Sequence, residues 1–252
     1  MEHLQPLDGA ALRGNEAMQE EIARRFERDG IVVLTNFVGA TELARINREI
    51  DAHYAPLLAR ARELLETETP EKRQFECDVL AWNPCAEGSE PFTRLQAMPE
   101  LESATRACLG DGFSAPDSLV MLSTAGGRGQ AWHQDCATTD PSQFNLNRLF
   151  YTRDVTHEDG AIVVVPGSHR GGRIPPGGNQ EPIAGELALA PRAGTLVLLH
   201  GRVFHRVTPN VSGNARISVN FRSFPKQATP EVCRVGIYRN GNYDFVANKV
   251  VE

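Results

Sequence analysis

Apolar positions in the first 112 residues recur at helical spacing. Apolar side chains three and four apart, with charged residues between them, predict amphipathic helices over residues 15–28, 41–66 and 98–109. Pro56 falls inside the second of these helices and is expected to kink it, because proline lacks a backbone donor. The short apolar run at residues 31–34 predicts a buried strand between the first two helices.

Two N-terminal stretches follow neither a helical nor a strand pattern. Residues 1–14 are irregular and predict an arm without regular structure. Residues 67–91 combine charges with several prolines, which predicts loops with one short strand near residues 77–82.

After residue 112 the pattern changes to short apolar or alternating runs separated by glycine and proline. No helical period of useful length occurs here, and this punctuation is typical of turns between β-strands. The predicted strands are residues 118–124, 130–135, 146–153, 161–165, 186–189, 195–200, 203–207, 215–223 and 235–238. Many short strands after a helical portion favour a mainly β fold with N-terminal helices, a jelly roll or related barrel with helices on one outer face.

No repeat or linker divides the 252 residues, so we expect a single domain, because β barrels of this size fold as one unit. Residues 1–112 are expected to supply the helices and the substrate-side elements. Residues 113–225 are expected to form the jelly-roll core, and residues 226–252 a C-terminal tail.

Composition narrows the class of partner. The net charge of -6 argues against nucleic acid or an anionic membrane. No apolar run approaches the roughly 20 residues of a membrane helix, and the first residues lack the basic start of a secretory signal. The five cysteines form no C-x-x-C pair, and a reduced, cytoplasmic setting is the simplest interpretation.

His133 and Asp135 lie two residues apart on a predicted strand. Side chains at this spacing point the same way, so both could reach one metal ion. Iron sites that must also bind oxygen and a co-substrate commonly use two histidines and one carboxylate on one face of the ion. A His-x-Asp step is also common by chance, so the hypothesis depends on a third ligand elsewhere.

The third ligand is sought among the seven histidines, of which His200 and His205 lie in the late strands. His200 ends an apolar run and is equally well explained as a core or rim histidine. His205 alternates with Val203 and Val207, and the strand that follows it carries a polar face. We therefore favour His205.

The predicted strand 215–223 alternates cleanly between two faces. One face carries Ile217, Val219 and Phe221, and the other carries Arg216, Ser218 and Asn220. If this polar face is buried, Arg216 could bind a carboxylate through two parallel hydrogen bonds, and Ser218 would add a hydroxyl. A solvated face explains the pattern equally well.

Four motifs now stand in one order along the chain. They are the stretch Asp29–Val38, then Trp132-His133-Gln134-Asp135, then Asp159-Gly160 through Pro166-Gly167-Ser168-His169, and last Gly194 through His205 and Pro209-Asn210 to Arg216. Over nearly the whole chain this order resembles the phytanoyl-CoA dioxygenase family of iron- and 2-oxoglutarate-dependent oxygenases. One departure is Thr195, where the family often has Asp after the glycine.

The resemblance implies a double-stranded β-helix, a cupin-like jelly roll. It implies iron(II) on His133, Asp135 and His205, with 2-oxoglutarate and O2 as co-substrates and Arg216 on the distal carboxylate of 2-oxoglutarate. Gln130 matches a position that contacts the co-substrate in some members. Halogenating relatives replace the metal carboxylate by Ala or Gly, so the intact Asp135 argues against halogenation.

The activity implied by the resemblance is oxidation, most simply hydroxylation, of an unactivated C–H bond in a small molecule, with release of succinate and CO2. Desaturation or cyclisation at the same site, in natural-product biosynthesis, is one alternative. A non-catalytic cupin-like metal- or ligand-binding protein is another. Retention of all three ligand types together with Arg216 favours the enzyme.

Two segments, residues 75–96 and 136–146, are expected by analogy to line the mouth of the site. Trp82, Asn83 and Arg94 are candidate substrate contacts there, although a tryptophan in such a place is more often part of the core. The basic stretch from His169 to Arg173 is a candidate for binding a phosphate-bearing group, but a solvated loop explains it better.

Overall fold

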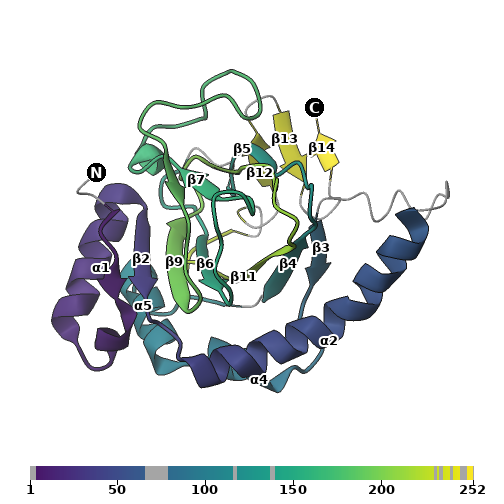
Figure 1. Cartoon of the computed structure of the whole chain (residues 1–252). Helices are drawn as coiled ribbons and strands as arrows, with labels where there is room; N and C mark the ends of the chain where they lie inside the picture. Colours follow the sequence, from purple (N-terminus) through teal and green to yellow (C-terminus); the bar gives the residue numbers. More distant parts are fainter. Residues whose placement is uncertain are drawn as a thin grey trace.

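Two seven-stranded sheets form a barrel-like body in the computed structural model, which describes residues 4–65, 79–115, 118–136, 140–229, 232, 235–238, 241–244 and 249–251. The barrel lies at the centre of the molecule, with helices on one side of it and beneath it (Figure 1). This agrees with the predicted jelly roll with N-terminal helices.

The first sheet has the order β1-β2-β9-β6-β11-β4-β3. Its strands are β1 Leu7–Asp8, β2 Ile31–Thr35, β9 Thr195–His200, β6 Leu146–Tyr151, β11 Arg216–Ser223, β4 Leu119–Ser123 and β3 Val79–Trp82. All neighbours pair antiparallel except β1 and β2. The central strands β6 and β11 therefore have a hydrogen-bonded neighbour on each side.

The second sheet has the order β14-β13-β12-β5-β10-β7-β8 and is antiparallel throughout. Its strands are β14 Lys249–Val251, β13 Gly241–Asp244, β12 Val235–Tyr238, β5 Gln130–Gln134, β10 His205–Val207, β7 Ile162–Val164 and β8 Leu187–Leu189. Residues 226–252, predicted as a tail with one strand, thus contribute three strands to this sheet.

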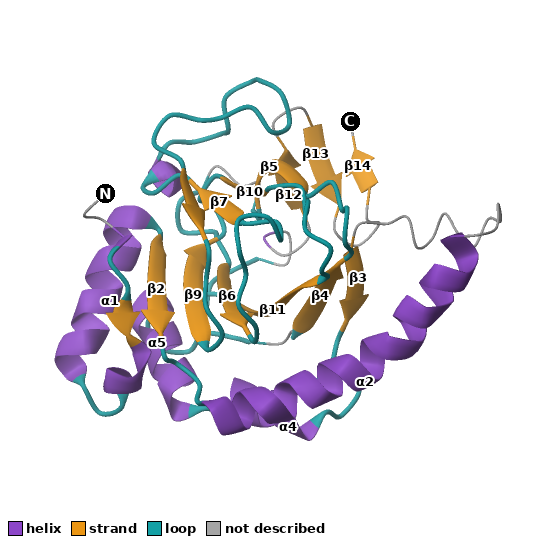
Figure 2. Cartoon of the chain, in the orientation of Figure 1, coloured by secondary structure: helices purple, strands orange, loops and turns teal. Residues whose placement is uncertain are grey.

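Four α-helices pack on the outer face of the first sheet (Figure 2). They are α1 Glu16–Asp29, α2 Ala40–Leu65, α4 Glu90–Gln96 and α5 Pro99–Leu109, and two short 3₁₀ turns, η2 Gly9–Leu12 and η3 Ser168–Arg170, complete the regular structure. Asn15 caps α1 by accepting the N–H of Met18 at 3.1 Å, and Gly30 ends it in a left-handed conformation. The predicted helices 15–28, 41–66 and 98–109 are confirmed, and α2 continues through Pro56.

Three N-terminal elements were not predicted: β1, η2 and α4. The α4 helix has only seven residues, and Pro91 lies in its first turn, where the missing N–H of proline costs no helical hydrogen bond. In the sequence the same proline indicates a loop. Every strand predicted after residue 112 is present, most of them a residue or two shorter than predicted.

Two hydrophobic clusters of the described residues lie on opposite faces of the first sheet. Outward side chains such as Phe150 and Val219 pack with the helices, whereas inward side chains such as Leu149 and Leu199 pack against the second sheet. Strand alternation therefore directs every second residue of β6 and β11 into the barrel. No helix in the described part of the chain is long and apolar enough to cross a membrane.

Candidate metal centre

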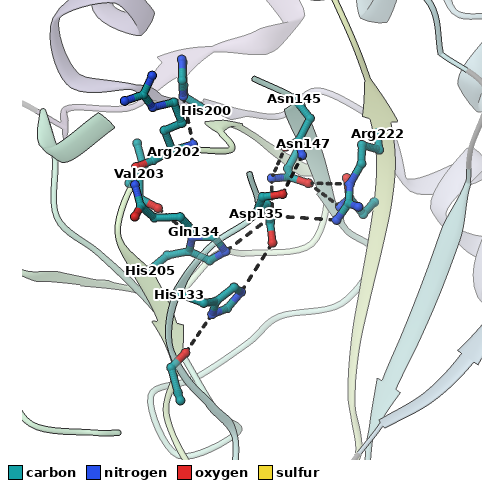
Figure 3. Close-up of polar contacts among 12 residues, drawn as sticks. His133, Gln134, Asp135, Asn145, Asn147, His200, Arg202, Val203, His205 and Arg222 are labelled. Carbon is teal, nitrogen blue, oxygen red and sulfur yellow. Dashed lines mark hydrogen bonds and ion pairs between the residues drawn. The ribbon is translucent and has the colours of Figure 1, made fainter. Parts of the chain in front are cut away.

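His133, Asp135 and His205 come together inside the barrel, as predicted. Each offers one ligand atom, and these atoms lie within 4.8 Å of one another. β5 and β10 pair antiparallel with His133 directly opposite His205, which brings two residues 72 positions apart side by side. All three side chains are buried and converge on one point (Figure 3).

The two imidazole rings are held in the tautomer that a metal requires. Nδ1 of His133 lies 2.8 Å from the carbonyl oxygen of Ala131, and Nδ1 of His205 lies 2.9 Å from that of Val203. A carbonyl only accepts, so each Nδ1 carries the proton and each Nε2 keeps its lone pair. Both Nε2 atoms face Asp135, at 3.6 Å from one or other carboxylate oxygen.

Asp135 follows the last residue of β5, so neighbouring side chains and backbone hold it in place. Its N–H donates to the carbonyl of Gly201 at 2.6 Å, and its carbonyl accepts from Asn145 at 3.1 Å. Nδ2 of Asn147 donates to the Oδ2 atom of the carboxylate at 2.6 Å, and Arg222 lies 3.9 Å from the same atom. These contacts orient the carboxylate towards the histidines.

Asn147, Asn220 and Arg222 are the functional residues that the sequence did not reveal. The side-chain oxygen of Asn147 accepts from Asn220 at 2.8 Å and from Arg222 at 3.3 Å, which fixes the direction of its amide group. For Arg222, the signal available in the sequence was the polar face of strand 215–223, because Arg222 stands two residues after Asn220 on that face. Nothing local linked Asn147 to that face.

The protonation states also suit metal ligands. Burial lowers the pKa of His133 to about 3, and His205 adds to the shift against the attraction of Asp135. Burial would raise the pKa of Asp135, but His205, Arg222, His133 and a hydrogen bond from Asn147 together bring it below its ordinary value. The site therefore presents a neutral imidazole and an ionised carboxylate at neutral pH, as metal binding needs.

One cavity inside the barrel is lined by all three ligands. Gln130, Arg216 and Ser218 line it as well, so the polar face of β11 points into the barrel and the alternative of a solvated face is wrong. Arg216 is 7% exposed, and its buried Nε has no hydrogen-bond partner. A buried guanidinium with an unsatisfied N–H is costly, so the cavity fits a ligand that accepts hydrogen bonds and carries negative charge.

Trp132 and Gln134, beside the ligands on β5, face away from the cavity. Trp132 is fully buried, donates its indole N–H to the carbonyl of Glu181 at 2.8 Å and lies under the guanidinium of Arg206. Gln134 donates to two carbonyls, those of Gly172 and Arg202. Through these hydrogen bonds, Trp132 and Gln134 hold the segment that precedes β8 against the outer face of the second sheet.

Other sequence candidates lie outside the cavity. Trp82 stacks on His53 with ring centroids 4.2 Å apart, so the core interpretation of this tryptophan holds. Asn83 accepts from Ser118, and Arg94 lies on α4 beside Glu90. Within the segment 75–96, the described residue that lines the cavity is Val79.

His200 lies outside the metal cluster, buried against aromatic side chains. Its Nδ1 accepts the N–H of Arg202 at 3.0 Å, and its ring stacks on Phe144 at 4.1 Å. His169 lies beside it, with ring centroids 4.9 Å apart, and contacts the carbonyl of Glu27. Among the described residues, the histidine that joins His133 and Asp135 in one cluster is His205.

Comparison with known proteins now decides the family. The family model for phytanoyl-CoA dioxygenase (PhyH) matches residues 26–218. The chain belongs to the phytanoyl-CoA dioxygenase family. The match covers all three cluster residues as well as Gln130, Arg216 and Ser218.

Two curated relatives are fungal dioxygenases. Dioxygenase trt7 of Aspergillus terreus (strain NIH 2624 / FGSC A1156) is 23% identical over 220 residues, which are 84% of this chain and 75% of the relative. Dioxygenase hkm4 of Aspergillus hancockii is 26% identical over 206 residues, which are 74% of this chain and 65% of the relative.

Solved structures share the fold. The epimerase SnoN, in complex with Fe3+, alpha ketoglutarate and nogalamycin RO, is 22% identical with a TM-score of 0.58, over 89% of this chain and 87% of SnoN. HygX from Streptomyces hygroscopicus, with nickel and 2-oxoglutarate bound, is 16% identical with a TM-score of 0.64, over 82% of this chain and 87% of HygX. Family membership and the His–Asp–His cluster together make this chain an iron- and 2-oxoglutarate-dependent dioxygenase.

Proposed function

We propose that the chain hydroxylates an unactivated C–H bond of a small metabolite, with release of succinate and CO2. The observation that carries the proposal is one cavity that holds both a buried His–Asp–His cluster and a buried arginine, Arg216, whose Nε has no hydrogen-bond partner. The cluster suits iron(II), and the arginine suits a dicarboxylic co-substrate.

Each residue has a defined part in this proposal. His133, Asp135 and His205 hold the metal on one face and leave the opposite face open to the cavity. Arg216 binds the distal carboxylate of 2-oxoglutarate, with Ser218, one alternate position further along β11, adding a hydroxyl. Gln130 lies across the cavity at the start of β5 and contacts the co-substrate from the second sheet.

The protein itself positions the reactants and excludes water from the site. When bound, iron with 2-oxoglutarate and oxygen supplies an oxidant strong enough to take hydrogen from an unactivated carbon. The chain's own groups fix the ligand geometry, neutralise the co-substrate and line the interior with apolar side chains such as Leu149, Ile162 and Val207. These side chains keep the site dry and place the substrate carbon near the metal.

Anaerobic titration tests the metal and co-substrate roles. Iron(II) and 2-oxoglutarate added together should produce a weak visible charge-transfer band. His205→Ala should lose this band, whereas His157→Ala, at an exposed turn, should keep it. If His205→Ala kept the band in full, the assigned site would be wrong.

Substrate-dependent release of succinate then tests the activity. SnoN is named an epimerase, so its fold is compatible with an outcome other than hydroxylation. Mass spectrometry separates these outcomes: hydroxylation adds one oxygen, desaturation or cyclisation removes two hydrogens, and epimerisation leaves the mass unchanged. No succinate release with any candidate would favour a binding protein instead.

We also infer a cytoplasmic setting and a role in biosynthesis. The described cysteines Cys85, Cys108 and Cys136 are free thiols, which fits a reducing compartment. One SnoN structure names nogalamycin biosynthesis, and a HygX structure contains hygromycin B. A cavity enclosed between the two sheets suits a small-molecule substrate better than a macromolecule.

A further inference from the structure

A short segment on the outer face of the second sheet lies against the two strands that carry the metal histidines. The segment is residues 179–181, between η3 and β8. Trp132 faces away from the cavity and donates its indole N–H to the carbonyl of Glu181 at 2.8 Å, so the contact is made behind the metal centre. None of the three residues of the segment lines the cavity. Any effect they have on the metal centre therefore passes through β5 and β10.

The segment lies where the pairing of β5 with β10 changes register. His205 stands opposite His133, and Val207 stands opposite Gln130. Two residues of β5 thus lie between these pairs but only one residue of β10, which is the arrangement of a β-bulge. On a regular strand, residues three apart face opposite sides. The bulge is the reason why Gln130 and His133 both line the cavity.

The bulge also supplies the acceptor for the ring of His133. Ala131 and Trp132 are the two bulge residues, and both stand opposite Arg206. Nδ1 of His133 donates to the carbonyl of Ala131 at 2.8 Å. A change in the bulge would therefore move both the backbone that carries this ring and the group that orients it.

One side-chain amide closes the bulge from the outer face. Nε2 of Gln180 donates to the carbonyl of Gln130 at 2.9 Å and to that of Val207 at 3.2 Å, so it joins the two strands directly beside the bulge. The N–H of Trp132, inside the bulge, donates to the carbonyl of Asn179 at 3.1 Å. A bulge interrupts the regular ladder of hydrogen bonds, and the segment supplies partners for the backbone groups at this interruption.

The amide of Gln180 is held in the donating direction. Its Oε1 accepts from Nη1 of Arg206 at 2.7 Å, which leaves the nitrogen facing the two carbonyls. Arg206 is itself fixed, because it is buried over the ring of Trp132 and forms an ion pair with Glu186 at 2.9 Å. The bulge is therefore fastened by a side chain whose own position is determined by its neighbours.

We propose that Gln180 is a positioning residue for the metal centre. Its amide holds the β5 bulge closed, and the bulge directs His133 towards the metal and Gln130 towards the co-substrate. This inference rests on the proposed function, because that function gives His133 and Gln130 their roles.

Gln180→Glu tests this role, because it keeps the length of the side chain and removes the donor. A glutamate still accepts from Arg206, but its carboxylate has no hydrogen for the carbonyls of Gln130 and Val207 and repels them. The bulge should open, while the new ion pair with Arg206 keeps the fold. Co(II) should bind about ten-fold more weakly than to the wild type. The visible absorption of bound Co(II), which depends on the geometry of its ligands, should also change.

Gln96→Glu is the matched control. Gln96 is also half-buried and also donates to a backbone carbonyl, that of Ala115 at 2.7 Å, but it lies on α4, outside the cavity. This variant should lose stability in urea unfolding and keep the Co(II) affinity and absorption of the wild type. Glu186→Gln is a second control, because it removes the charge that pairs with Arg206 and leaves the amide of Gln180 in place. It should keep the Co(II) absorption as well.

The outcomes separate this inference from the proposed function. Unchanged Co(II) affinity and absorption in Gln180→Glu would overturn the positioning role, and so would an equal change in Gln96→Glu, since a general loss of stability would then explain both. If Gln180→Glu does not fold, Gln180→Met, which has a similar length and no charge, replaces it under the same criteria. A wild type that bound no Co(II) would overturn the proposed metal site itself, and the inference with it.

Discussion

The carboxylate of Asp135 is oriented by one short hydrogen bond. Asn147 donates to its Oδ2 at 2.6 Å, and Asn220 and Arg222 hold the amide of Asn147 in the donating direction. An oxygen atom engaged by Asn147 is a poorer second ligand. Asn147 would therefore fix the orientation in which Asp135, together with His133 and His205, would hold the metal.

Asn147→Ala should weaken metal binding by about ten- to a hundred-fold, the usual effect of losing a residue that orients a metal ligand. Titration with Co(II), followed by absorption and by calorimetry, measures both affinity and coordination number. Asn47→Ala is a control, because Asn47 binds the carbonyl of Thr152 in the helical layer. Equal Co(II) affinity in the wild type and in Asn147→Ala would refute this role.

His200 makes stability depend on pH. Burial lowers its pKa to about 2, and His169 and Arg202 add to the shift. An unfolded histidine titrates near 6.5, so below that pH the unfolded chain binds a proton that the folded chain does not. The free energy of unfolding should therefore fall as pH falls, by about 1.4 kcal/mol per pH unit for this group.

Urea unfolding of the metal-free protein at several pH values between 7 and 5 checks this sign. His200→Asn keeps an acceptor for the N–H of Arg202 but does not titrate. The free energy of unfolding of this variant should therefore depend less steeply on pH, because its unfolding takes up about one proton fewer than that of the wild type. The same slope in the variant and the wild type would mean that His200 is not the group responsible.

Candidate residues on a strand with one polar and one apolar face were predictable from the sequence. Those on a strand that is buried on both faces were not. His133 and Asp135 lie two apart on one strand, and Arg216 stands on a clean polar face. β6 is buried at every position, because helices cover one of its faces and the second sheet covers the other. Its sequence therefore gives no sign that Asn147 faces a cavity.

At the scale of elements, the approach to β5 depends on a glycine. Gly129 has φ +75°, and a Cβ there would lie 2.2 Å from the carbonyl oxygen of Val207 on β10. The two strands that carry the metal ligands can approach each other at this point only because Gly129 has no side chain.

Gly129→Ala should destabilise the protein by several kcal/mol, because it adds a backbone clash to the strain of a left-handed alanine. Gly126→Ala is the matched control: Gly126 has φ +76°, but nothing lies within 4 Å of its Cβ position. This control should cost about 1–2 kcal/mol. Urea unfolding measures both, and equal losses would show that the close approach of β5 and β10 contributes nothing.

Helices of three or more turns, and strands bounded by glycine or proline, were predictable from the sequence. In each, the spacing of the apolar residues along the segment itself indicates the structure. The short α4 helix was missed, because a proline at the start of a helix and a proline in a loop look alike in sequence. The pairing of β5 with β10, which creates the metal cluster, joins residues 72 positions apart, and no local pattern encodes it.

At the scale of the whole molecule, the candidate site joins the two sheets. His133 and His205 lie on the second sheet, with Asp135 directly after β5. Asn147, Arg216 and Ser218 lie on β6 and β11 of the first sheet. The proposed metal and co-substrate therefore connect the sheets through the barrel interior, where the free protein leaves buried polar groups without partners.

Ligand binding should consequently stabilise the whole fold. A ligand at a hundred times its dissociation constant adds about 2.7 kcal/mol, which raises the melting temperature of a chain of this size by roughly 5–10 °C. The largest rise should need Mn(II) and 2-oxoglutarate together, because the co-substrate binds through the metal at one end and through Arg216 at the other. Thermal melts with each ligand alone and with both measure this coupling, and His133→Ala should abolish it. If 2-oxoglutarate raised the melting temperature equally without Mn(II), or in His133→Ala, then its binding would not depend on the metal and the two sheets would not be joined through this site.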